Sequence, residues 1–258
     1  MKVHGVFEWR KHYDKKPLAI VGPGPSYDAI NPALHQSVTV FALNAAITEF
    51  TTHPDAYWLS NDHDRTFMNE GIRKAIEPRI AGYDPWRTIT NRKFIPGEFG
   101  DIDWVDHHGR PQGPMKFRIP CPEGSEIWWY HENEGFPGYC YHGQSVLELA
   151  LEVATAWGFD PIILFGVDLC LVAKGRKHAL SGPQRPSDGG VYYASPWQWK
   201  GTPARIYRGK MTEVRRSIID HMHRWSSPIY TTSPYWEDAP FVYLPVPEAL
   251  GVFAGAKH

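Results

Sequence analysis

A short apolar segment that runs directly into a glycine- and proline-rich turn constrains the fold of this chain most. The segment is Leu18-Ala-Ile-Val21, and the turn that follows is Gly22-Pro-Gly-Pro-Ser26. An apolar segment that is too short for a helix and is stopped by glycine is typical of a buried parallel strand. Glycines let the backbone approach a ligand closely, and a serine at the start of a helix offers its hydroxyl and N–H groups to an anion. The residues therefore predict either a phosphate-binding turn or a rigid strand-to-helix connection without a ligand.

Three further apolar segments end in a polar residue in the same way. They are residues 38–44 (VTVFALN), 55–62 (DAYWLSND) and 161–168 (PIILFGVD). Strands that deliver polar residues at their carboxyl ends describe the ligand-binding edge of an open α/β sheet. We therefore expect an α/β fold in which a mostly parallel sheet is flanked by helices.

Three segments have the apolar spacing of helices. Residues 65–77 predict a crossover helix, and residues 211–225 predict an amphipathic helix. The most regular segment spans residues 143–158, where Ser145 is the expected N-cap and Glu148 follows three residues later. This spacing is that of a capping box.

The remaining segments lack such regularity. We interpret residues 1–258 as a single α/β domain. Residues 78–140 are rich in Gly, Pro and aromatic residues and predict an irregular insertion. Residues 171–205 predict a mobile lid loop. Residues 228–231 are the expected last strand, followed by a Pro-rich tail, and residues 1–17 are expected to cover an edge of the sheet.

The net charge of the chain is close to zero, which excludes attraction of a charged partner by the charge of the protein as a whole. The chain has 27 basic and 28 acidic residues among 258, so net charge attracts neither nucleic acid nor an anionic membrane. Partners must therefore be recognised locally. Basic and aromatic residues in the irregular stretches leave a nucleic-acid acceptor open, and the sequence also leaves a homo-oligomer open.

Cysteine usage and hydropathy indicate the compartment. Cys121, Cys140 and Cys170 show neither paired spacing nor a zinc pattern, which favours a reducing compartment. No apolar stretch reaches the length of a membrane span, and the first residues lack the apolar centre of a signal peptide. We therefore expect a cytoplasmic protein without a membrane span.

Three segments resemble one linked group of proteins. They are the turn from Val21 to Ser26, the strand end Phe41-Ala-Leu-Asn44, and the block from Gly143-Gln-Ser to Ile163-Leu-Phe-Gly-Val-Asp168. The set is similar to the motifs of the bacterial CMP-sialic-acid-dependent sialyltransferases and of the related 6-hydroxymethylpterin pyrophosphokinase-like (MptE-like) domain. The resemblance implies a Rossmann-like fold, of the glycosyltransferase-A-like variant, that holds a nucleotide at the strand ends.

The same resemblance implies a set of site residues. Those that would contact the nucleotide or its sugar are Gly22, Gly24, Pro25, Ser26, Asn44, either Asn61 or Asp62, Gly143, Gln144 and Ser145. Asp168 would lie near the reacting centre, either as a general base for an acceptor hydroxyl or as a hydrogen-bond partner of the ribose. His178, in the loop that follows, is the candidate acid or base, and its alternative interpretation is an exposed loop histidine.

Asp62 and Asp64 form an Asp-x-Asp pattern directly after an expected strand. Sugar-nucleotide transferases often hold a divalent metal across the diphosphate with such a pair, and carboxylate oxygens suit Mg²⁺ or Mn²⁺. In the alternative interpretation Asp64 caps the following helix and Asp62 is only solvated.

These observations predict a transferase. We expect it to move a sugar from a nucleotide-activated donor, of CMP or UDP type, to a hydroxyl of a small-molecule or glycan acceptor. Two alternatives remain: a diphosphotransferase of the 6-hydroxymethylpterin pyrophosphokinase type that uses ATP and Mg²⁺, and a nucleotide-binding domain without catalysis.

Overall fold

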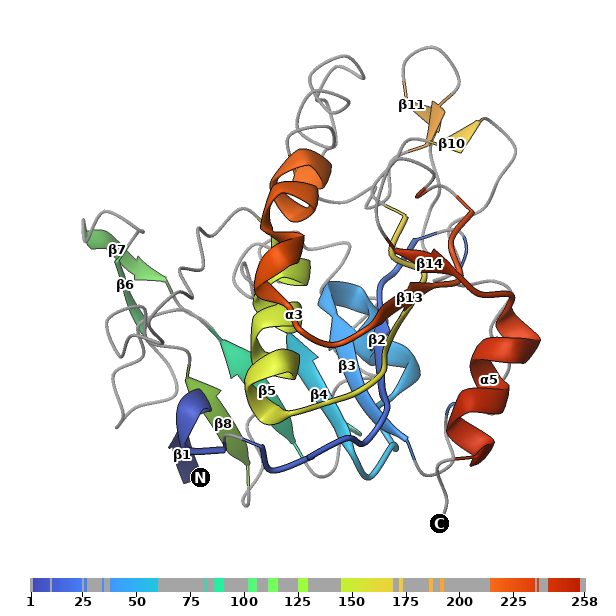
Figure 1. The fold of residues 1–258 in the computed structure, drawn as a ribbon. Coiled ribbons are helices and arrows are strands. Elements are labelled where there is room, and N and C mark those ends of the chain that lie inside the picture. Colours follow the sequence, from blue (N-terminus) through green and yellow to red (C-terminus); the bar gives the residue numbers. More distant parts are fainter. Residues whose placement is uncertain are drawn as a thin grey trace.

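The fold was analysed in a computed structural model of the chain (Figure 1). The residues that it describes are 2–9, 11–24, 26, 34, 38–59, 82, 86–90, 102–105, 111–115, 125–129, 145–168, 172–173, 186–187, 191–192, 214–234, 236 and 241–255.

Nine strands form a central sheet in which every pairing is parallel. Their order in the sheet is β1-β8-β5-β4-β3-β2-β9-β13-β14. This arrangement confirms the expected mostly parallel α/β fold. The strands are β1 (Lys2–Gly5), β2 (Leu18–Val21), β3 (Thr39–Leu43), β4 (Ala56–Leu59), β5 (Arg87–Thr90), β8 (Glu126–Trp129), β9 (Ile162–Phe165), β13 (Ile229–Thr231) and β14 (Val242–Tyr243).

The strand order reverses between β2 and β9. From β2 the chain adds β3, β4, β5 and β8 in one direction, and it then returns to the other side of β2 to add β9, β13 and β14. Figure 1 shows β2 and β9 running upward side by side. In open α/β sheets the crevice at such a reversal, outside the carboxyl ends of the strands, is where ligands bind. The fold therefore places the preferred ligand position between the ends of β2 and β9.

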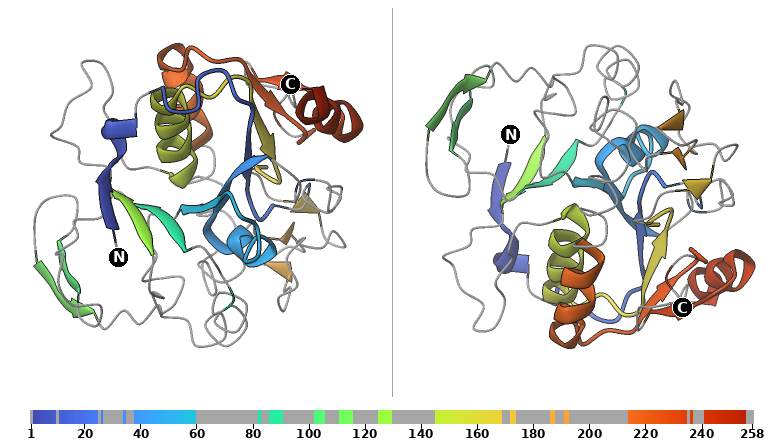
Figure 2. Two further views of the ribbon diagram at one scale, coloured as in Figure 1. Left: turned by 90° about the horizontal axis from the view of Figure 1, so that it is seen from below. Right: turned by 90° about the horizontal axis from the view of Figure 1, so that it is seen from above.

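Both faces of the sheet are covered, because successive strand residues contribute to two different cores. In β2, Leu18 and Ile20 belong to the core beneath helix α3 (Val146–Trp157), whereas Ala19 and Val21 belong to the core on the opposite face. The second core is closed by the 3₁₀ helix η4 (Asn44–Glu49) and by helix α5 (Val246–Gly255). Figure 2 shows α3 and the helix of residues 214–221 lying together on one face. Because both faces of the strands are buried, their sequences are continuous apolar runs and do not alternate between apolar and polar residues.

Helix α3 begins and ends as the sequence predicts. The Ser145 hydroxyl accepts a hydrogen bond from the Glu148 N–H, and the Glu148 carboxylate accepts one from the Ser145 N–H, which completes the capping box. At the other end Gly158 adopts the left-handed conformation with φ of 88°. The predicted N-cap is therefore confirmed, and Gly158, the last residue of the predicted segment, ends the helix as a glycine C-cap.

Two expectations need correction. Residues 78–140, expected as an irregular insertion, contain β5 and β8, which are strands of the central sheet. The residues after β13, expected as a Pro-rich tail, contain β14 and helix α5. Pro247 is compatible with that helix because a proline in the first turn removes an N–H that has no partner within the helix. The edge position of β1 agrees with the expected role of residues 1–17.

The remaining elements are short. The 3₁₀ helices are η1 (Val6–Trp9) and η5 (Met222–Arg224), and residues 214–221 confirm the described part of the helix expected at 211–225. The crossover helix expected at 65–77 lies outside the described residues. Within the expected lid loop, the described residues form three short antiparallel strands. The strands outside the central sheet are β6 (Ile102–Val105), β7 (Pro111–Met115), β10 (Val172–Ala173), β11 (Pro186–Ser187) and β12 (Val191–Tyr192).

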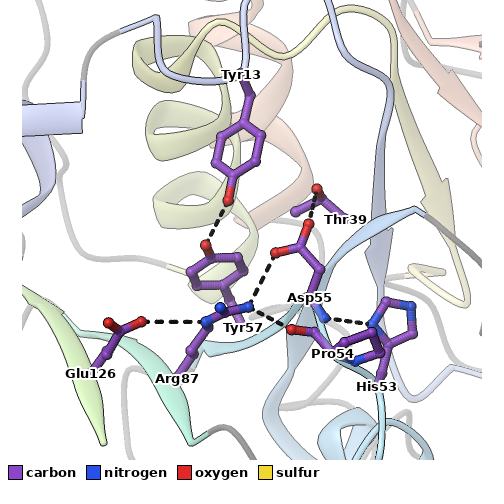
Figure 3. Close-up of polar contacts among 8 residues, drawn as sticks. All are labelled: Tyr13, Thr39, His53, Pro54, Asp55, Tyr57, Arg87 and Glu126. Carbon is purple, nitrogen blue, oxygen red and sulfur yellow. Dashed lines mark hydrogen bonds and ion pairs between the residues drawn. The ribbon is translucent and has the colours of Figure 1, made fainter. Parts of the chain in front are cut away.

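A polar network lies at the edge of the sheet that is formed by the amino-terminal ends of strands β4, β5 and β8, called the amino-terminal edge below (Figure 3). Arg87, which begins β5, forms ion pairs with Asp55 before β4 at 3.2 Å and with Glu126 at the start of β8 at 3.4 Å. Its guanidinium lies over the ring of Tyr57, whose hydroxyl is 2.6 Å from that of Tyr13. The charges of this edge are therefore paired within the protein.

We predict that stability falls steeply in alkali because of the two tyrosines. Burial raises the pKa of Tyr13 to about 12 and raises the pKa of Tyr57 as well, whereas an unfolded tyrosine titrates near pH ~10. Above about pH 10 the unfolded chain loses protons that the folded protein keeps, so the free energy of unfolding decreases as pH rises from there toward 12. The free energy of unfolding decreases by at most about 1.4 kcal/mol per pH unit for each tyrosine.

Urea unfolding between neutral and alkaline pH would measure this slope. The double variant Tyr13→Phe/Tyr57→Phe should flatten it, whereas Tyr243→Phe, at a tyrosine that is 56% exposed, should leave it unchanged. An equally steep slope in the double variant would contradict the assignment.

Candidate functional site

The turn after β2 lies directly against the end of β9. The Gly22 N–H donates to the Phe165 carbonyl and the Gly24 N–H donates to the Gly166 carbonyl, each at 2.7 Å. A Cβ atom on Gly24 would lie 2.4 Å from both the Gly166 oxygen and the Asp168 Oδ2. Glycine is therefore required here by the close approach of two backbones.

Asp168 joins three segments at this point. Its side chain is buried, with 1% of the residue exposed. Oδ2 accepts a hydrogen bond from the Ser26 N–H at 2.9 Å, and Oδ1 accepts one from the Ser233 hydroxyl at 2.5 Å. Ser233 follows β13, so the carboxylate connects the ends of β2, β9 and β13. A role for Asp168 as general base stays a prediction.

The hydroxyl of Ser26 is buried and has no hydrogen-bond partner among the residues that the structure describes. Buried polar atoms in folded proteins nearly always have a partner, and an exception calls for a specific explanation. The backbone N–H of the same residue is held by Asp168, so the position of Ser26 is fixed although its hydroxyl is unsatisfied.

Asn44 stands at the same edge of the sheet, at the end of β3, which pairs with β2. Its φ of 51° lies in the left-handed region, which asparagine adopts more readily than most residues. Its carbonyl accepts a hydrogen bond from the Trp58 indole at 2.9 Å. The backbone of Asn44 is therefore held by the side chain of Trp58 in β4.

Ser145 lies at the amino terminus of α3, where its hydroxyl and N–H both contact Glu148. The Glu148 side chain is buried and also accepts a hydrogen bond from the Ser217 hydroxyl at 2.6 Å. The described contacts of Ser145 thus cap its own helix, and Glu148 connects that cap to helix 214–221. Contact of Ser145 with a nucleotide stays a prediction.

Three residues at the end of β9 were missed by sequence reasoning: Ser233, Trp236 and Arg215. The Trp236 indole donates to the Val167 carbonyl at 2.6 Å, and Arg215 Nη1 donates to the Asp168 carbonyl at 3.4 Å. A signal for Ser233 was present, because hydroxyl residues follow β13 directly, as Asn44 follows β3. Arg215 and Trp236 carry no comparable signal.

Several predicted site residues lie outside the described residues. They are Pro25, Asn61, Asp62, Asp64, Gly143, Gln144 and His178. The part of the chain that the structure describes contains no group of three or more His, Cys, Asp or Glu residues that could hold a metal ion. The metal site predicted at Asp62 and Asp64 is untested by this finding. Among the described helices, none has the length and apolar character needed to cross a membrane.

Comparison with known proteins supports the fold. No protein-family model and no curated protein matches the chain. Among solved structures, the chain is similar to the MAf glycosyltransferase from Magnetospirillum magneticum AMB-1, with a TM-score of 0.51 and 14% identity. This likeness is one of fold and agrees with the expected Rossmann-like α/β architecture. The alignment covers 96% of this chain and 38% of that one, so this chain spans less than half the length of its neighbour. The narrower resemblance to sialyltransferases and MptE-like domains stays a prediction.

We predict that Gly24→Ala destabilises the protein by about 1–3 kcal/mol, the usual cost of overpacking, because the new methyl group meets backbone and a buried carboxylate. The matched control is Gly251→Ala in α5, where an added Cβ would have no atom within 4 Å. That variant should gain about 0.5–1 kcal/mol from helix propensity. Urea unfolding measures both changes, and equal stabilities of the two variants would contradict the close approach.

Proposed function

We propose that this chain is a transferase that moves a sugar from a nucleotide-activated donor of CMP or UDP type to a hydroxyl acceptor, a small molecule or a glycan. The observation that carries the proposal is the buried, unsatisfied hydroxyl of Ser26, in a glycine-rich turn at the reversal of the strand order. Backbone that approaches this closely, with a hydroxyl beside it, is suited to the phosphates or ribose of a nucleotide.

Two further observations support the proposal. The fold likeness to a glycosyltransferase spans nearly the whole of this chain. In addition, Asn44 at the end of β3 and Asp168 after β9 lie at the same edge of the sheet as Ser26. Residues far apart in sequence thus gather where open α/β sheets bind ligands.

In this proposal Asp168 is a positioning residue. It holds the Ser26 N–H and the Ser233 hydroxyl, and so fixes the turn that receives the nucleotide. The acceptor hydroxyl must lose a proton as it attacks the sugar and the bond from the sugar to the phosphate breaks, and His178 is the proposed general base that takes this proton. Mg²⁺ or Mn²⁺ at Asp62 and Asp64 would neutralise a diphosphate leaving group.

Ligand binding and turnover test this function together. Isothermal titration with CMP, UDP, ATP and the corresponding nucleotide sugars, with Mg²⁺ and with EDTA, identifies the nucleotide class and the need for metal. Release of CMP or UDP from the sugar donor with an acceptor present supports the transferase. Release of AMP from ATP selects the diphosphotransferase, and binding without turnover selects a non-catalytic domain. The absence of binding by all of them would overturn the proposal.

We predict that Ser26→Ala weakens nucleotide binding about tenfold, as expected for one hydrogen bond to a charged group. The ligand-free variant should be at least as stable as the original protein, because the hydroxyl that is removed has no described partner.

The matched control is Ser227→Ala, whose hydroxyl donates to the Phe159 carbonyl at 2.7 Å. It should lose about 1 kcal/mol of stability and keep full nucleotide affinity. Titration calorimetry and urea unfolding of both variants check these opposite patterns. A Ser26→Ala variant with lower stability and unchanged affinity would mean that the hydroxyl has only a structural role.

A further inference from the structure

We infer that the turn of residues 22–26 binds a hydroxyl of the ribose of the nucleotide and does not bind its phosphate. This inference rests on the proposed function and narrows it, since the proposal alone allows either group at Ser26. The turn follows β2 and lies against the end of β9, where the strand order reverses (Figure 1). The hydrogen-bonding groups of the turn decide which part of a nucleotide it can hold.

The turn has no backbone N–H group left for an anion. Positions 23 and 25 are prolines, which have no N–H. The other three N–H groups all donate to the chain at or just after β9. The donors and acceptors are Gly22 and the Phe165 carbonyl at 2.7 Å, Gly24 and the Gly166 carbonyl at 2.7 Å, and Ser26 and the Asp168 carboxylate at 2.9 Å. Glycine-rich phosphate sites work through such N–H groups, which point at the phosphate oxygens, whereas here the same groups join two segments of the protein.

The groups that border the turn on the β9 side are hydrogen-bond acceptors. The Gly166 oxygen and Asp168 Oδ2 lie so close to Gly24 that an added Cβ would be 2.4 Å from each of them. The Asp168 side chain is buried, and charges with little access to water are poorly screened. The carboxylate would therefore repel a phosphate placed against the turn, whereas a hydroxyl can donate to these acceptors.

The Ser26 hydroxyl is suited to a hydroxyl of the ligand. It is buried, and none of the described residues forms a hydrogen bond with it. A serine hydroxyl can both donate and accept, and a ribose hydroxyl has the same capacity. The Asp168 carboxylate, which holds the Ser26 N–H, is an acceptor beside it, and in dinucleotide-binding α/β folds an acidic side chain accepts from a ribose hydroxyl. The turn thus offers a ribose both a hydroxyl and a carboxylate.

Hydroxyls occur both on the ribose and on the transferred sugar of the proposed donor. The ribose is favoured because the turn lies at the reversal of the strand order, where open α/β sheets bind nucleotides. In this arrangement the phosphate is held by groups outside the turn.

The test is a double-mutant cycle between Ser26 and the ribose. CMP and UDP, their 2′-deoxy and 3′-deoxy forms and the corresponding nucleotide sugars are titrated into the full chain and into Ser26→Ala. Ser26→Ala should bind CMP or UDP about fivefold more weakly, which is the loss for a hydrogen bond between uncharged groups and is smaller than that for a charged partner. One deoxy form should bind the original protein more weakly by a similar factor. Ser26→Ala should bind that form as well as the original protein does, because the hydrogen bond is already absent.

Ser227→Ala is the matched control, because the Ser227 hydroxyl donates to the Phe159 carbonyl at 2.7 Å. It should bind every form with the affinity of the original protein. Urea unfolding checks that each variant is folded, and Ser26→Gly, which also lacks the hydroxyl, carries the test if Ser26→Ala does not fold.

The possible failures separate this inference from the proposed function. Failure of the original protein to bind any nucleotide or nucleotide sugar would overturn the proposed function. If the original protein binds CMP or UDP, an equal loss in Ser26→Ala for the ribose form and both deoxy forms would assign Ser26 to the phosphate. A loss confined to nucleotide sugars would assign Ser26 to the transferred sugar, and unchanged affinity for every ligand would exclude its hydroxyl from the site. Each of these three results would overturn the ribose contact alone.

Discussion

The buried carboxylate of Asp168 is the interaction on which the arrangement of the carboxyl-terminal edge depends. A carboxylate with so little access to water needs hydrogen-bond donors from the protein, and here they come from Ser26 and from Ser233. The two donors belong to the segments that follow β2 and β13, the strands on either side of β9. One acidic side chain therefore fixes the relative position of three strand ends, and the conformation of the glycine-rich turn follows from that.

The two edges of the sheet satisfy their polar groups differently. At the amino-terminal edge, Arg87 is paired with Asp55 and Glu126, and the hydroxyls of Tyr13 and Tyr57 bond to each other (Figure 3). At the carboxyl-terminal edge, the Ser26 hydroxyl is buried without a described partner. Paired charges stabilise a fold, whereas a polar group that is held in place with its hydrogen-bonding capacity unused is typical of a ligand site.

Much of this fold could be predicted from local patterns. Apolar runs that stop at a polar residue located β2, β3, β4 and β9, and the capping box located α3. The same pattern predicted that Ser26 and Asp168 lie at one edge of the sheet, and the two residues form a hydrogen bond although 142 positions separate them in the sequence. Strand β5 could not be predicted in this way, because Arg-Thr-Ile-Thr is short and half polar and is a strand only through its pairing with β4 and β8. Trp236 and Arg215 could not be assigned either, since their contacts with Val167 and Asp168 join segments that are far apart in the sequence.

The Glu148 carboxylate connects helix α3 to the helix of residues 214–221. One of its oxygens holds the first turn of α3 through Ser145, and the other accepts the hydroxyl of Ser217 from the neighbouring helix. The two helices are thus coupled through a single acidic group and should shift as one rigid unit in any rearrangement. An exchange of Glu148 alone would leave both the Ser145 N–H and the Ser217 hydroxyl without this acceptor.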